Sequence, residues 1–132
     1  MLLEADILAE NIEYDIVEDG AGGTSYQGSI TTTYDKLETL FGKPSYSSGD
    51  PYEKVNTEWI IDGKVYYIDE WGEKDWEYVT ATVYNWKTGY TPTGEYDWHI
   101  GGNSYDAVDF IREILDGQVE PEYRLTLSLI HI

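Results

Sequence analysis

Apolar and polar residues alternate near the start of the chain, as they do in a strand with one buried face. In segment 11–17, three apolar side chains alternate with two carboxylates, and a period of two residues is typical of a half-buried strand. Segment 18–25 has the glycine-rich composition of a loop, and 26–30 is suited to a return strand. The pattern therefore predicts an acidic N-terminal hairpin over residues 11–30.

The residues that follow have the spacing of a short helix. Thr32 is suited to cap its N-terminus, with Asp35 three residues later, and Gly42 and Pro44 end it. The apolar residues of this segment then share one face of the helix and are Tyr34, Leu37, Leu40 and Phe41.

The centre of the chain predicts an antiparallel sheet. Segments 55–61 and 64–69 are suited to strands, and the Asp62-Gly63 dipeptide between them is a strong pattern for a two-residue hairpin turn. Further along, the sequence predicts a charged connection at 71–76, a strand at 77–86 and a short strand at 95–100.

A second helix is expected between the glycine-rich segment 101–104 and Gly117, because apolar residues recur there at helical spacing. The order of elements predicts a single α+β domain, an antiparallel sheet of about five strands with two helices on one face. We expect this domain to span residues 1–126, with the acidic hairpin at 11–30 and a core at 31–117.

The last six residues do not resemble a domain ending. Leu127-Ser-Leu-Ile-His-Ile132 is the translation of CTG TCT CTT ATA CAC ATC, a sequence used in adapters for DNA sequencing. We interpret residues 127–132 as a non-native tail on an open reading frame from environmental DNA, and expect it to contribute little to folding. His99 is then the one native histidine.

Acidic residues dominate the charge of the chain. The 132 residues include 26 Asp and Glu against 8 Lys and Arg, which gives a formal charge of −18. Such a surface repels nucleic acid and anionic lipid, so we expect a basic protein partner, no direct nucleic acid and no membrane. No apolar run approaches the ~18 residues of a membrane span.

The motifs of common catalytic sites are absent from the sequence. The chain has no cysteine, which excludes disulfides, thiol catalysis and zinc–thiolate sites. It has no nucleophile elbow, phosphate-binding loop, dinucleotide fingerprint or His-Glu-x-x-His pair, and the acidic segment 15–20 lacks the spacing of a calcium loop. We therefore expect no enzyme, no cofactor and no metal site.

Four short motifs lie between residues 33 and 102: TYDKLETLFGKP at 33–44, TEWII at 57–61, VYNWKTG at 83–89 and WHIGG at 98–102. Taken together, they resemble a family of small, uncharacterised bacteriophage proteins, over residues 31–115. The resemblance implies a phage origin and a non-enzymatic accessory role.

Two tryptophans inside a charged segment indicate a contact surface for another protein, because Trp is enriched at binding hot spots. The competing interpretation is that one of Trp71 and Trp76 caps the sheet and the other lies flat on a loop.

Duplex DNA carries one charge per ~1.7 Å, so 18 net charges correspond to roughly 30 Å of duplex, close to the diameter of about 35 Å of such a domain.

We therefore hypothesise a phage counter-defence or host-takeover protein that acts by binding in the cytoplasm of the infected bacterial host. Its acidic surface would occupy a basic, nucleic-acid-binding site of a host protein. Acidity for solubility alone is the competing explanation, and it does not require the charges to gather on one face. The expected contact residues are Glu13, Asp15, Glu18, Asp19, Asp69, Glu70, Trp71, Glu73, Asp75 and Trp76.

A second hypothesis is a protein that sequesters a small nucleotide signal. The expected start of the second helix would offer free backbone N–H groups to a phosphate, although capping by Asn103 or Ser104 explains the same residues without a ligand. A virion or assembly component and a homo-oligomer are also left open by the sequence. The residues of the expected nucleotide site are His99, Gly101, Gly102, Asn103 and Ser104.

Overall fold

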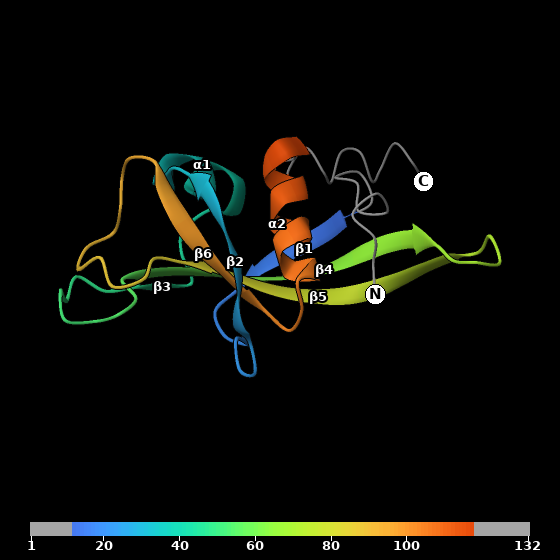
Figure 1. The fold of residues 1–132 in the computed structure, drawn as a ribbon, viewed down its shortest axis with the longest axis horizontal. Helices are drawn as coiled ribbons and strands as arrows, with labels where there is room; N and C mark the ends of the chain where they lie inside the picture. The colour runs from blue at the N-terminus through green and yellow to red at the C-terminus, as the bar shows by residue number, and fades with distance from the viewer. Residues whose placement is uncertain (1–11, 118–132) are drawn as a thin grey trace.

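The computed structural model describes residues 12–117, in which six strands form one antiparallel sheet and two helices pack against it (Figure 1). The elements are β1 (Ile12–Val17), β2 (Ser25–Thr32), α1 (Tyr34–Phe41), β3 (Tyr46–Ser47), β4 (Thr57–Ile68), β5 (Lys74–Tyr84), β6 (Tyr96–Gly102) and α2 (Asp106–Gly117). The strand order is β1-β4-β5-β6-β2, and β3 pairs with the start of β4 outside this path.

The predicted α+β class is confirmed, with six strands where about five were expected. Both helices lie on the same side of the sheet (Figure 1). Between residues 12 and 117, neither helix is long and apolar enough to cross a membrane. The predicted tail 127–132 and both expected domain limits, 1 and 126, lie outside the described residues.

The core lies between the sheet and the two helices. The indole rings of Trp59 and Trp98 meet edge to face at its centre, 5.6 Å apart, and both side chains are fully buried. Nε1 of Trp59 donates to the carbonyl oxygen of Gly42 at 2.9 Å, which ties β4 to the end of α1. The helices contribute the buried side chains Leu37, Leu40, Phe41, Ala107, Val108, Phe110, Ile111, Ile114 and Leu115.

Helix α1 begins one residue later than the sequence predicts. The side chain of Thr33, not Thr32, caps it and accepts the backbone N–H of Lys36, because Thr32 is the last residue of β2 and pairs with Tyr96. Gly42 ends the helix as expected, with φ at +77° and its N–H donated to the carbonyl oxygen of Glu38 at 2.8 Å.

The predicted N-terminal hairpin over 11–30 is wrong, although both of its strands exist. β1 pairs with β4 and β2 pairs with β6, so the two strands lie at opposite edges of the sheet. Alternation of apolar and polar residues indicates a half-buried strand, but it does not select the partner. Here cross-strand packing does so, since Ile12 lies opposite Val65 and Ile16 opposite Ile61.

The predicted turn at Asp62-Gly63 is also wrong, because β4 continues through both residues. The Phe110 ring of α2 lies against Gly63: a Cβ at this position would be 2.6 Å from Cζ of Phe110 and 2.7 Å from the carbonyl oxygen of Glu13. A glycine inside a strand marks such a close approach of a neighbouring group. The Asp-Gly pair therefore serves helix packing and not chain reversal.

The turn that joins β4 to β5 is formed at residues 69–73, where Asp69 holds it together. The carboxylate of Asp69 accepts the backbone N–H of Trp71 at 2.9 Å and that of Glu73 at 2.8 Å, and Gly72 has a φ of +77°. On either side of this turn, β4 and β5 pair only with each other among residues 12–117. We call this two-stranded ribbon, residues 66–78, the arm; it projects past α2 in Figure 1.

Candidate functional site

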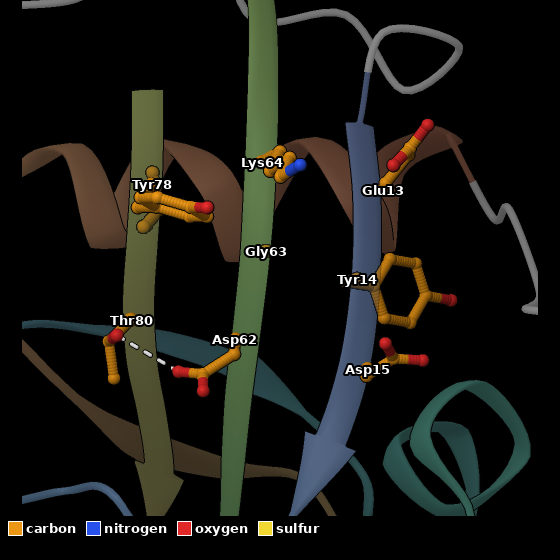
Figure 2. A pocket seen from close by; sticks show the side chains of 9 residues that line it. Glu13, Tyr14, Asp15, Asp62, Gly63, Lys64, Tyr78 and Thr80 are labelled. Carbon is orange, nitrogen blue, oxygen red and sulfur yellow. Dashed lines mark hydrogen bonds between the residues drawn. The ribbon is translucent and has the colours of Figure 1, made fainter. Parts of the chain in front are cut away.

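The helices cover one face of the sheet, and we call the opposite face the open face. Because side chains alternate along a strand, the even-numbered residues of β4 and β5 project from the open face, and their odd-numbered neighbours meet the helices. An open depression of this face lies between β1, β4 and β5 (Figure 2). The side chains around it are those of Glu13, Asp15, Asp62, Lys64, Tyr78 and Thr80.

Acidic residues of neighbouring strands lie opposite each other at this depression. Asp15 lies directly opposite Asp62 in the β1–β4 register, and Glu13 lies opposite Lys64. Like charges directly opposite each other destabilise an antiparallel pair. The hydroxyl of Thr80 donates to Asp62 at 2.9 Å, and Figure 2 shows this carboxylate turned towards Thr80. A cationic group placed between Asp15 and Asp62 would relieve their repulsion.

The lysines of β4 and β5 lie over aromatic rings instead of beside carboxylates. Nζ of Lys64 is 4.7 Å from the ring centroid of Trp76 and 5.6 Å from that of Tyr78. Nζ of Lys74 is 5.0 Å from the ring centroid of Tyr66. These cation–π contacts stabilise the arm, which has no third strand beside it in the part of the chain that the structure describes. Among residues 12–117, neither lysine forms an ion pair with a carboxylate, although Glu13 lies opposite Lys64.

Direct ion pairing is scarce in the described part of the chain. Among residues 12–117, the ion pair that the structure shows joins Arg112 to Asp109 within α2, at 3.4 Å. Exposed carboxylates are also present on the helix side, for example Asp35 and Glu38 of α1. Negative charge is therefore not confined to the open face, and what distinguishes that face is the combination of carboxylates with exposed aromatic rings.

The arm exposes large apolar side chains to solvent. The exposed fraction is 78% for Trp71, 73% for Tyr78, 64% for Ile68 and 40% for Trp76. The rings of Trp76 and Tyr78 meet edge to face at 4.6 Å. Neighbouring exposed apolar side chains on a protein surface are typical of an interaction site. Both tryptophans expected to act as anchors thus lie where a partner reaches them.

The structure distributes the expected contact residues along the sheet and does not gather them in one patch. Glu13 and Asp15 lie on the open face of β1, Glu18 and Asp19 follow β1, and the other six lie in the arm. From Ile60, which is opposite Val17, β4 extends about 30 Å to the turn, at about 3.3 Å per residue. Most of the expected residues therefore form a row with the depression in its middle. Asp75 does not belong to it, because this odd-numbered residue of β5 projects from the helix side, where the hydroxyl of Tyr67 donates to its carboxylate at 3.4 Å.

Four of the six side chains around the depression were missed by the sequence: those of Asp62, Lys64, Tyr78 and Thr80. Asp62 was assigned to a turn, which hid its place on the open face. The alternation from Thr57 to Ile68 was the pattern that could have identified both β4 residues as neighbours on one face.

The expected nucleotide site at 99–104 is not formed as predicted. Gly101 and Gly102 belong to β6, where they pair with β5 and β2, and α2 begins only at Asp106. His99 and Gly101 lie on the open face, whereas Gly102 packs against Ala107 on the helix face. The glycines are needed for these close approaches and not for a turn, so the five residues do not share a site.

Ser104 has the capping role that was the competing explanation. Its hydroxyl accepts the backbone N–H of Asp106 at 3.2 Å. Asn103 and Ser104 line a small depression together with Glu77 and Asp106. Two carboxylates at this place disfavour an anionic ligand.

The surroundings of His99 favour the neutral form of its imidazole over the protonated form. Burial lowers the pKa of His99 below its ordinary value, and the nearby Asp97 opposes this shift. In an unfolded chain a histidine titrates near pKa 6.5, so the unfolded protein takes up a proton at a higher pH than the folded protein does. The stability associated with neutral His99 is therefore present above this pH and decreases as the pH falls below it.

We expect the His99→Gln variant to lack the part of the acid-induced loss of stability that arises from protonation of His99. Urea unfolding of both proteins at about pH 7.5 and about pH 5 measures it, and the wild type is expected to lose more stability than the variant. The difference should be below about 1 kcal/mol, because the side chain keeps contact with solvent. An equal loss in both proteins, or a smaller loss in the wild type, would contradict the assignment.

Comparison of the chain with protein-family models, curated proteins and solved structures finds no match.

Proposed function

We propose that the protein is a non-enzymatic phage protein that acts in counter-defence or host takeover. In this proposal, the open face and the arm occupy a basic, nucleic-acid-binding site on a host protein in the cytoplasm of the infected bacterium. The observation that carries the proposal is the pairing of Asp15 with Asp62 across β1 and β4 on an exposed face. A lysine or arginine of the partner would neutralise this pair.

The arrangement of the other groups supports the same role. Lys64 and Lys74 lie over aromatic rings, and neither forms an ion pair with a carboxylate among residues 12–117. Trp71 supplies an exposed apolar anchor at the tip of the arm, as binding hot spots require. The acidic residues of this surface are spread along about 30 Å of the sheet.

A pull-down from host lysate at low and at high salt tests the proposal. Attraction between an acidic face and a basic site weakens as salt screens the charges. We expect a nucleic-acid-binding host protein to be captured at low salt and released at high salt. Capture only of proteins without a basic site, or capture that is insensitive to salt, would contradict it.

A further inference from the structure

A second group of aromatic rings lies on the open face at the end opposite the arm. Tyr84 stacks on His99 with ring centroids 5.5 Å apart and 25° between the planes. Tyr26 meets the imidazole edge to face at 5.0 Å, and Trp86 does so at 6.3 Å. The exposed fraction is 57% for Tyr26 and 40% for Trp86. We call these four residues the His99 cluster.

Two lysines converge on one edge of this cluster. Nζ of Lys54 is 6.0 Å and Nζ of Lys87 is 5.6 Å from the ring centroid of Trp86. The backbone N–H of Lys87 donates to the carbonyl oxygen of Lys54 at 2.7 Å, which holds the two residues side by side. Two cations therefore lie at one ring, and Glu53 and Glu58 line the depression that contains Lys54.

A buried pair of asparagines fixes the two loops that carry these lysines. Oδ1 of Asn85 accepts the backbone N–H of Asn56 at 2.8 Å and that of Thr57 at 2.9 Å. Nδ2 of Asn85 donates to Oδ1 of Asn56 at 3.1 Å, and both side chains are fully buried. This satisfied polar network fixes the backbone of the two loops that carry Lys54 and Lys87 relative to each other.

Beside His99, the open face carries a glycine that cannot be replaced by a larger residue, and an unpaired polar atom. A Cβ on Gly101 would collide with the hydroxyl of Thr82 and lie 3.5 Å from the Tyr84 ring, so only glycine fits there. Nδ1 of His99 is buried and has no hydrogen-bond partner among the described residues.

We propose that the His99 cluster binds a nucleoside monophosphate, with the base against Tyr26 and Trp86 and the phosphate between Lys54 and Lys87. Aromatic side chains on the open face of a sheet stack bases of any identity, and ammonium groups bind phosphate as point charges. This site differs from the one expected at 99–104, since lysines and not a helix N-terminus supply the phosphate contacts.

The charge of the whole chain does not prevent binding of such a small ligand. Charges more than about 8 Å away are largely screened at physiological salt, so the ligand is governed by the groups around the cluster. Among these, Glu58 lies opposite Tyr84 and Asp97 precedes His99 by two residues. These two carboxylates favour a monophosphate over a polyphosphate or a polynucleotide. The inference does not depend on the proposed contact with a host protein.

Calorimetric titration of the full chain with AMP, adenosine and ribose 5-phosphate at about 0.15 M salt tests the proposal. We expect AMP to bind about tenfold more tightly than adenosine, and ribose 5-phosphate to bind most weakly. Lys54→Gln with Lys87→Gln should remove the preference for AMP over adenosine. Lys36→Gln with Lys43→Gln removes the same charge elsewhere and should leave that preference unchanged.

A tyrosine pair tests the stacking half of the site. Tyr26→Ala should weaken both AMP and adenosine by about tenfold, whereas Tyr90→Ala, which removes a tyrosine that is 67% exposed outside the cluster, should weaken neither. Absence of saturable AMP binding, an AMP preference that survives loss of Lys54 and Lys87, or equal effects of the two tyrosine variants would overturn the proposal. None of these results would change the outcome of the pull-down, so the two proposals fail separately.

Discussion

Gly63→Ala is expected to lower the free energy of unfolding by about 3 kcal/mol, at the upper end of the cost of overpacking a core. The added Cβ would be 2.6 Å from Cζ of Phe110 and 2.7 Å from the carbonyl oxygen of Glu13. The Phe110 ring can move away from this Cβ only if α2 shifts, and the carbonyl oxygen of Glu13 only if β1 shifts. Denaturant unfolding followed by circular dichroism measures the change.

Gly94→Ala is the matched control, because a Cβ at Gly94 has no atom within 4 Å and the residue does not need a positive φ. We expect its stability to change by less than about 0.5 kcal/mol. Combining Gly63→Ala with Phe110→Leu should recover part of the loss, since the shorter side chain relieves one of the two contacts. A stabilised Gly63→Ala variant, as expected for a glycine in an ordinary strand or turn, would show that Phe110 does not pack there.

Reversal of four carboxylates on the open face and arm should weaken binding of the captured host protein by about a hundredfold or more. The variant is Glu13→Lys, Asp15→Lys, Glu70→Lys and Glu73→Lys. Asp69 is left unchanged because its carboxylate accepts two backbone N–H groups of the turn. The fold should survive, and titration of the partner in calorimetry measures the affinity.

The control reverses four carboxylates outside the open face and arm, with the same change in net charge: Asp35→Lys, Glu95→Lys, Glu113→Lys and Asp116→Lys. If the partner binds the open face and arm, this control variant should retain most of the affinity. If both variants lose affinity equally, the net charge of the chain alone attracts the partner, and the acidity serves solubility.

The local pattern of the sequence predicts most of the elements but not how they pair. Alternating side chains identified β1 as a strand, and helical spacing identified α2. Strand partners depend on contacts between residues far apart in the chain, such as Ile12 with Val65, and no local pattern records them. The hairpin at 11–30 was wrong for this reason.

Glycines account for the wrong turn at Asp62-Gly63 and the wrong helix start at 101–104, because one residue type serves two purposes. Gly63 permits the approach of Phe110, and Gly102 permits the approach of Ala107. Their neighbours in the sequence, Asp62 and Asn103, made both glycines resemble parts of turns. Only the three-dimensional packing distinguishes a glycine required by a neighbour from one required by a positive φ, as at Gly42.

The acidic and aromatic character of the candidate surface was predicted, but its arrangement was not. Trp71 and Trp76 were selected from their charged surroundings, and both are exposed. The opposition of Asp15 and Asp62 follows from the β1–β4 register, and the convergence of Lys54 and Lys87 on Trp86 follows from two loops that meet in space. Neither is a property of a local segment.

Competition with duplex DNA tests the central claim most directly. Labelled duplex is bound to the captured host protein, the acidic protein is added, and fluorescence anisotropy reports the bound DNA. The account predicts that the protein displaces the duplex completely and that the variant with four reversed carboxylates on the open face and arm does not. A ternary complex, with the duplex still bound when the host protein is saturated with the acidic protein, would contradict it.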